Sequence, residues 1–124
     1  MSVKKLMDLS GKVALVTGGS RGLGLQIAEA LGEMGARLAL TARKADELAQ
    51  AKEHLERMHV EVFTLPCDHS KAAGIQPAIE KIVKHYGQVD VLVNNAGTTW
   101  GAPAEEHPLE AWEKVMDLNV TGLF

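Results

Sequence analysis

A glycine-rich turn near the start of the chain has the residue types and spacing to hold a phosphate group. The turn is Thr17–Gly24, with the sequence TGGSRGLG, and it separates the apolar run Val13–Val16 from a helical pattern that starts at Leu23. Glycines let backbone N–H groups approach a diphosphate, and a helix N-terminus adds about half a positive charge beneath it. A strand, a glycine turn and a helix in this order therefore predict a dinucleotide site.

The charges after the second apolar run indicate which dinucleotide would bind. A ribose 2′-hydroxyl needs an acceptor carboxylate at the end of the second strand, whereas a 2′-phosphate needs cations. No acid stands there: Arg43 and Lys44 follow the run, and Arg21 lies in the glycine turn. Arg43 and Arg21 predict NADP (NADPH) in preference to NAD. The alternative is that the two cations after the run are solvated at a helix start, where Asp46 and Glu47 offset their charge.

The elements that must position these residues follow from the hydrophobic pattern. Short apolar runs alternate with longer runs of helical period, which is typical of a parallel sheet covered by helices on both faces. We expect the third helix to begin at Pro77, with looser structure before it, because a proline ring suits a first turn. Right-handed crossovers give the strand order 3-2-1-4 and a crevice at the carboxyl ends of strands 1 and 4. Strands are predicted at 13–17, 37–41, 61–65 and 89–94, and helices at 21–34, 45–58, 77–86 and from 109 onward.

Three further motifs follow the glycine turn in order. They are Cys67-Asp68 after the third strand, Asn94–Gly97 (NNAG) after the fourth, and Asp117–Val120 (DLNV) in the last helical pattern. With these motifs and its TGxxxGxG turn, the chain resembles the short-chain dehydrogenase/reductase family over essentially its whole length. The resemblance implies an α/β, Rossmann-like doubly wound sheet. It also implies that residues 1–124 form the NADP-binding domain, incomplete at its C-terminus, of an oxidoreductase that interconverts a secondary alcohol and a ketone.

The resemblance implies a set of cofactor-binding residues at matching positions of this chain. Among them, Asp68 would bind the adenine amino group and Asn95 would contact the ribose. For Asp68 the alternative is an ordinary turn residue at the end of a strand. The full set is Gly18, Ser20, Arg21, Gly22, Leu23, Gly24, Arg43, Asp68, Asn95, Ala96 and Gly97.

One catalytic residue of the family has a counterpart here. Asn119 matches the helix asparagine that holds a water in the family's proton relay, but the serine and the YxxxK pair are absent from the chain. Tyr86 is followed four residues later by Asp90, and its place on an apolar stripe predicts packing. We therefore expect the chain to bind cofactor and to be nearly inactive alone, as the N-terminal portion of a longer enzyme. A non-catalytic nucleotide-binding module is the alternative.

Substrate choice is left open by the motifs. The chain is similar to the family's branch of 3-oxoacyl reductases and of gluconate and polyol dehydrogenases, so the small-molecule substrate would be a 3-oxoacyl compound or a sugar acid or polyol. Trp100 follows the fourth-strand turn and is expected to shape that preference, whereas Trp112 on the helical stripe is expected in the core. By the same resemblance, the longer enzyme would be a homodimer or homotetramer.

Composition excludes several other classes. A net charge of -3 gives no reason to expect nucleic acid or an anionic membrane as a partner. No apolar stretch approaches the roughly 20 residues of a membrane span, and residues 2–9 lack the apolar centre of a signal peptide, so we expect a cytoplasmic protein. The histidines lack metal-ligand spacing and are expected on surfaces or loops, and Cys67 is expected to be a small buried residue. No metal is predicted.

Overall fold

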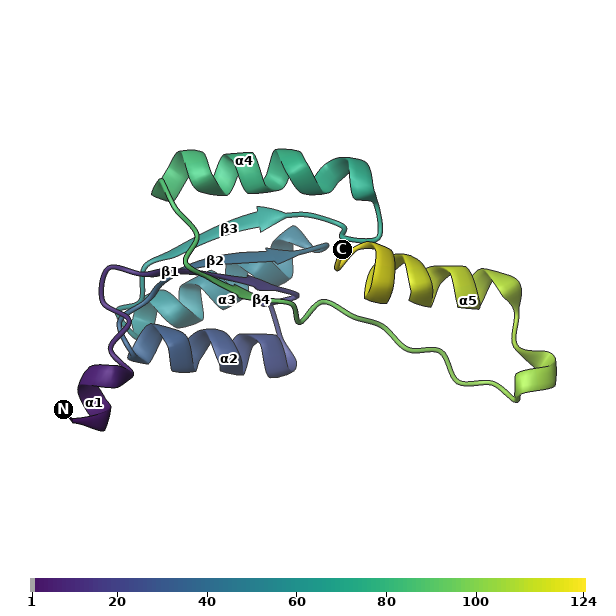
Figure 1. The fold of residues 1–124 in the computed structure, drawn as a ribbon, viewed down its shortest axis with the longest axis horizontal. Coiled ribbons are helices and arrows are strands. Elements are labelled where there is room, and N and C mark those ends of the chain that lie inside the picture. Colours follow the sequence, from purple (N-terminus) through teal and green to yellow (C-terminus); the bar gives the residue numbers. More distant parts are fainter. Residues whose placement is uncertain (1) are drawn as a thin grey trace.

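A parallel sheet of four strands forms the centre of the computed structural model, which describes residues 2–124 (Figure 1). The strand order is β3-β2-β1-β4, as predicted. Leu15 at the middle of β1 pairs with Ala39 of β2 on one side and with Leu92 of β4 on the other. The strands are β1 (Val13–Thr17), β2 (Arg37–Ala42), β3 (Val62–Pro66) and β4 (Val91–Val93).

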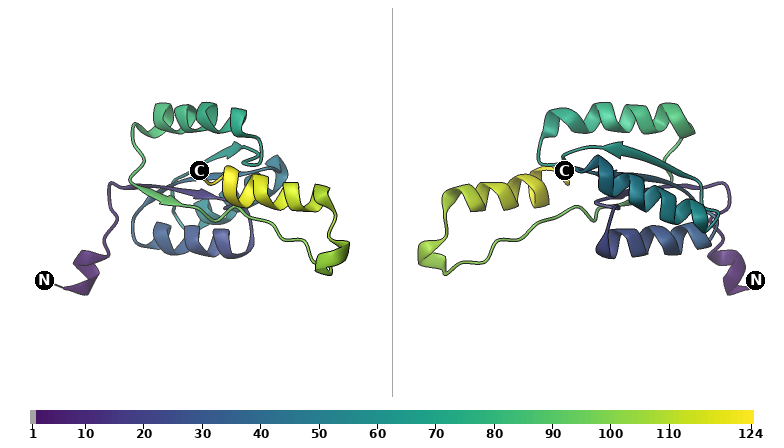
Figure 2. Two further views of the ribbon diagram at one scale, coloured as in Figure 1. Left: turned by 45° about the vertical axis from the view of Figure 1, so that its right-hand side comes forward. Right: turned by 180° about the vertical axis from the view of Figure 1, so that it is seen from behind.

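Helices cover both faces of this sheet. The helices α2 (Gly22–Glu33) and α3 (Ala45–Arg57) lie on one face, and α4 (Ile75–Tyr86) lies on the other (Figures 1 and 2). Every residue of β1 is buried, because the strand has neighbours on both sides and helices on both faces. Burial on both faces explains why β1 reads as a continuous apolar run and not as an alternating one. The glycine turn after β1 is therefore anchored to the most buried strand.

The chain after β4 leaves the sheet. An extended segment and a short 3₁₀ helix, η2 (Ala104–Glu106), lead to α5 (Leu109–Met116), which lies beyond the carboxyl end of the sheet (Figure 2). The helix continues as a π-helical turn, η3 (Asp117–Thr121), in which the Gly122 N–H donates to the Asp117 carbonyl at 2.8 Å. None of the helices in the described part of the chain is long and apolar enough to cross a membrane.

The π-helical turn brings the end of the chain back against the sheet. A Cβ at Gly122 would collide with the carbonyl oxygen of His69, so only glycine allows this approach. Thr98 in the extended segment also holds η3, because the Asn119 side chain accepts from its N–H at 2.9 Å and donates to its carbonyl at 2.8 Å. The C-terminal segment is thereby fixed over the carboxyl edge of the sheet.

Three details of the predicted elements are wrong. The fourth strand is shorter than 89–94, because the carboxylate of Asp90 takes the Val13 N–H at 2.8 Å and ends regular pairing there. The helix α4 begins at Ile75, after a 3₁₀ turn η1 (Ala72–Gly74), and Pro77 lies within its first turn, where a missing N–H costs nothing. Trp112 is 57% exposed and not in the core, because α5 lies beyond the sheet and not over it.

The remaining helix, α1 (Val3–Leu6), is a single turn at the N-terminus with Ser2 as its cap. It lies outside the sheet and its helical layers (Figure 1). The side chains of Val3 and Leu6 are exposed, so α1 adds little to the core. The sheet and the glycine turn therefore do not depend on it.

The turn between α3 and β3 carries backbone strain. His59 has a φ of 62°, the left-handed region that costs a residue with a Cβ about 1–2 kcal/mol, and its side chain is exposed. We expect His59→Gly to raise the free energy of unfolding by about 0.5–1 kcal/mol, since the relief outweighs the flexibility that glycine adds to the unfolded chain. Urea unfolding followed by circular dichroism measures it.

Gln50→Gly is the matched control, because Gln50 is exposed in the middle of α3 with ordinary helical geometry. That change should lower the free energy of unfolding by about 0.5–1 kcal/mol. Equal losses for the two variants would show that the left-handed turn imposes no cost on histidine.

Candidate cofactor site

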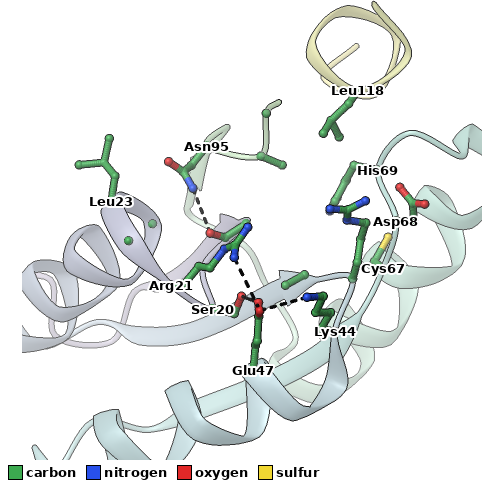
Figure 3. A pocket seen from close by; sticks show the side chains of 17 residues that line it. Ser20, Arg21, Leu23, Lys44, Glu47, Cys67, Asp68, His69, Asn95 and Leu118 are labelled. Atoms are coloured by element: carbon green, nitrogen blue, oxygen red, sulfur yellow. Dashed lines mark hydrogen bonds and ion pairs between the residues drawn. The ribbon is translucent and has the colours of Figure 1, made fainter. Parts of the chain in front are cut away.

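A cavity of about 300 Å³ opens at the carboxyl edge of the sheet, between the glycine turn, the ends of β2 and β3, and the segment after β4 (Figure 3). Every residue of the predicted cofactor set lines it. The structure adds six lining residues that the sequence did not place there. These additional residues are Ala42, Lys44, Glu47, Cys67, His69 and Leu118.

Hydrogen bonds from Thr17 and Asn95 hold the glycine turn. The Asn95 Nδ2 donates to the carbonyls of Thr17 (3.1 Å) and Gly18 (3.0 Å), and the Thr17 Oγ1 accepts from the N–H groups of Asn95 (3.1 Å) and Ala96 (3.0 Å). These bonds tie the end of β1 to the end of β4. Asn95 therefore positions the turn in addition to lining the cavity, and Thr17, the first residue of the motif, has a structural role that we did not predict.

Gly24 lets the turn and the helix approach each other. A Cβ at this position would collide with the Gly18 carbonyl and lie 2.5 Å from the Asn95 Nδ2. The N-terminus of α2 consequently sits directly against the turn, where its free N–H groups and its dipole face the cavity. This end of the cavity suits an anion.

Positive side chains surround the cavity where β2 ends. Arg21, Arg43 and Lys44 all line it. Glu47, in the first turn of α3, lies among them: its carboxylate is 3.8 Å from the Arg21 Nη1 and 3.6 Å from the Lys44 Nζ. The Ser20 hydroxyl donates to the same carboxylate at 3.3 Å. Of the two acids that we expected to offset the cations, Glu47 lies in the cavity. Its spacing of three residues from Lys44 was the only signal in the sequence for this pairing.

Asp68 lies at the cavity and has the structural role of a turn residue, which was the alternative expected for it. It lines the cavity, and its Oδ1 accepts from the Ser70 hydroxyl at 2.6 Å and from the Ser70 N–H at 3.0 Å. These bonds, led by the one from the hydroxyl, hold the pKa of the carboxyl below its ordinary value. Asp68 is therefore a turn residue at the cavity whose carboxyl ionises more readily than usual.

His69 lies in the turn after β3, as predicted for a loop histidine, but it is not on the surface. Its side chain is buried, it lines the cavity, and its Nε2 lies 2.8 Å from the Thr41 Oγ1. Gly122 packs on the backbone carbonyl of His69. Burial lowers the pKa of His69 from its ordinary value of 6.5, although the nearby Asp68 carboxylate opposes the shift.

Cys67 is buried, as predicted, and burial raises the pKa of its thiol, with a smaller contribution from the Asp68 carboxylate. Tyr86 is a packing residue, also as predicted. Its hydroxyl donates to the Leu38 carbonyl at 2.9 Å, and its ring meets that of Phe63 edge to face. Burial is the main cause that raises the pKa of Tyr86 to about 12. Neither residue has the properties of a proton donor or nucleophile at neutral pH.

Asn119 lies apart from this cavity. It lines a second hollow of about 330 Å³, formed between the extended segment and α5. Both ends of its side-chain amide are occupied by Thr98, as described above, so the side chain fixes the segment after β4. Its place in a π-helical turn is a geometry that occurs frequently at functional sites. The other lining residues of the hollow are Thr98, Thr99, Trp100, His107, Trp112, Val115 and Met116.

Comparison with known proteins defines the class. The family model described as short chain dehydrogenase matches residues 12–124, so the chain belongs to this family. The chain is 45% identical, over 117 residues, to the rhamnolipids biosynthesis 3-oxoacyl-[acyl-carrier-protein] reductase of Pseudomonas aeruginosa. It is 36% identical, over 124 residues, to the gluconate 5-dehydrogenase of Gluconobacter oxydans. These matches cover 94% and 100% of this chain but 45% and 48% of the two relatives, so the chain spans about half of their length.

Solved structures agree with this placement. The Pseudomonas aeruginosa RhlG/NADP active-site complex superposes with a TM-score of 0.90 at 44% identity, covering 95% of this chain and 46% of that one. An NAD⁺-bound xylitol dehydrogenase superposes with a TM-score of 0.90 at 32% identity, covering 94% and 45%. The Rossmann-like fold predicted from the sequence is therefore confirmed, and similar folds hold either nicotinamide cofactor.

The contact at Gly24 generates a prediction. We expect Gly24→Ala to lower the free energy of unfolding by about 1–3 kcal/mol, because the new Cβ displaces the Gly18 carbonyl and the Asn95 amide. Gly101→Ala is the control, since a Cβ there meets no atom within 4 Å. Urea unfolding compares the two, and a similar small effect from both would contradict the close approach.

The environment of His69 predicts a pH dependence of stability. Because its pKa is lowered on folding, the unfolded chain binds more protons than the folded chain just below pH 6.5, so the free energy of unfolding falls as the pH drops through that range. In His69→Gln, which keeps a polar atom near Thr41 but does not titrate there, this part of the fall should disappear. Urea unfolding between pH 7.5 and pH 5 measures it.

His107→Gln is the control for that experiment, because His107 lies outside the cavity, on the loop before α5. Its stability should depend on pH as the unsubstituted chain does. A fall that persists unchanged in His69→Gln would show that the buried ring is not the group responsible.

Proposed function

We propose that this chain binds NADP(H), in preference to NAD(H), for an oxidoreductase that interconverts a secondary alcohol and a ketone. The observation that carries the proposal is the single cavity in which a glycine turn, a helix N-terminus and three cations come together. The cations are Arg21, Arg43 and Lys44, and the strand before two of them ends at Ala42, without an acid. A 2′-phosphate needs such cations, and a diphosphate needs such a turn.

Each end of the cavity suits one part of the cofactor. We assign the diphosphate to the turn formed by Gly18, Gly22 and Gly24, with Ser20 and the backbone of Leu23 beside it. We assign the 2′-phosphate to Arg21 and Arg43. The adenine amino group belongs to Asp68, which stays ionised and can accept its hydrogen bond. The ribose is left to Asn95, with Ala96 and Gly97 forming a thin wall beside it.

The reaction needs groups beyond this site. When bound, the nicotinamide cofactor supplies or accepts the hydride, and a general acid or base must move the proton of the substrate oxygen. Asn119 is the residue of this chain that we assign to the proton relay. The serine and the YxxxK pair of the family are not found in residues 1–124, so we place catalysis in a longer protein that includes this domain.

The lining of the second hollow and the names of the relatives support a choice between the two expected substrate classes. Trp100, Trp112, Val115 and Met116 give the hollow an apolar lining beside Asn119. Such a lining suits an acyl chain better than a polyol, because an acyl chain gains from removing apolar surface from water, whereas the hydroxyl groups of a polyol need hydrogen-bond partners. We therefore favour a 3-oxoacyl substrate, as in the Pseudomonas relative, over the sugar acid of the Gluconobacter relative. A cytoplasmic homodimer or homotetramer completes the proposal.

Titration of the purified chain with NADPH and with NADH, followed by nucleotide fluorescence, tests the cofactor. A charge-assisted contact to phosphate contributes about 1.5–3 kcal/mol, so Arg43→Ala should weaken NADPH binding by about 10- to 100-fold and leave NADH binding nearly unchanged. Arg57→Ala is the control, because Arg57 pairs with Glu53 at the far end of α3 and does not line the cavity. Equal weakening of both cofactors by Arg43→Ala would contradict the 2′-phosphate contact, and no binding of either would reject the site.

A further inference from the structure

One acidic side chain lies among the cations of the cofactor cavity. Glu47 is held from three sides, by the Ser20 hydroxyl at 3.3 Å, the Arg21 guanidinium at 3.8 Å and the Lys44 ammonium at 3.6 Å (Figure 3). Its side chain is 25% exposed, whereas that of Arg21 is 75% exposed. The carboxylate is thus the shielded centre of this group, and the cations surround it from the solvent side.

Two of the three cations are consequently already paired. Arg21 and Lys44 share the carboxylate of Glu47, and Arg43 has no side-chain partner among the described residues within ion-pair distance. The other acid of the cavity, Asp68, is bonded to Ser70 after β3; its carboxylate interacts with Arg43 through space, beyond ion-pair distance. A phosphate placed among the cations would meet the negative charge of Glu47 at short range, and only part of that repulsion is screened by water.

A neutral ligand group at the same place would not be repelled by Glu47. A ribose 2′-hydroxyl carries no charge, so the Glu47 carboxylate does not repel it. The carboxylate also lies at the β2–α3 side of the cavity, where an acceptor for such a hydroxyl is useful. Glu47 therefore acts against the phosphate form of a nucleotide and not against the hydroxyl form.

We propose that Glu47 is a specificity-determining residue of the cofactor site, which lowers the preference for a 2′-phosphate over a 2′-hydroxyl by neutralising Arg21 and Lys44. The proposal rests on the proposed function, since it concerns the same cavity. Arg43 provides the preference for the phosphate, and Glu47 limits it. The chain would then bind NADP(H) better than NAD(H) by a smaller margin than its three cations alone would produce.

The test uses two nucleotides that differ only in the group concerned, adenosine 2′,5′-bisphosphate and AMP. Isothermal titration calorimetry of the chain measures both affinities, and circular dichroism confirms that each variant is folded. We expect Glu47→Gln to bind the bisphosphate about 3- to 10-fold more tightly and AMP within about 2-fold of the unsubstituted chain. Glutamine keeps the size of the side chain and can still accept from Ser20, so a purely structural role of Glu47 would not produce this split.

Asp46→Asn is the matched control. Asp46 lies next to Glu47 in the first turn of α3 and its loss changes the net charge equally, but it does not line the cavity. It should shift both affinities by less than about 2-fold. An equal gain from Asp46→Asn would overturn the proposal, because the effect would then belong to overall charge.

A double substitution tests whether Glu47 acts by neutralising Arg21. In Arg21→Ala, Glu47 has one cation fewer to neutralise, so adding Glu47→Gln should produce a smaller gain in bisphosphate affinity than it does alone. The outcomes separate the two proposals. No binding of either nucleotide by the unsubstituted chain would reject the proposed function itself. Binding by that chain, with bisphosphate affinity unchanged or weakened in Glu47→Gln, would overturn only the role of Glu47.

Discussion

The hydrogen bonds between Thr17 and Asn95 are the interaction on which the cofactor site depends. They join the ends of β1 and β4, and through the carbonyl of Gly18 they also shape the glycine turn. Both residues stand at the end of buried or half-buried strands, so these polar groups have little access to water and gain from pairing with each other. Because β1 is rigid and buried, the turn is presented as a fixed shape before any ligand arrives, and binding needs little ordering of the backbone.

The charged part of the site is built differently from the turn. Its groups are long side chains from the glycine turn, the residues after β2 and the first turn of α3, and they are partly exposed. Arg21 and Lys44 pair with Glu47. A phosphate that bound these two cations would therefore replace one anion with another. In the proposed function, the turn supplies general affinity for a dinucleotide, whereas the balance of side-chain charges decides which dinucleotide is preferred. Similar structures can differ in cofactor, as the NADP and NAD⁺ complexes among them do.

The C-terminal segment closes the site from the other side. Asn119 is bonded to Thr98, and Gly122 packs on the carbonyl of His69, so the π-helical turn is held between the segments that follow β3 and β4. Leu118 from the same turn reaches the cavity (Figure 3). A motif that resemblance assigns to proton relay therefore has a second, structural effect on the cofactor cavity.

The sequence by itself determined the strand order, the central β1 and the predicted cofactor residues that line the cavity. These depend on local features: apolar runs, glycine spacing and the handedness of crossovers. Only the tertiary structure showed that Glu47 and His69 belong to the cavity and that Trp112 is exposed. It also showed that Asp90 shortens β4 by taking the Val13 N–H with its side chain. The physical reason is that burial and charge pairing depend on what distant segments bring to the same point, whereas the period of an apolar pattern and the spacing of glycines are properties of neighbouring residues.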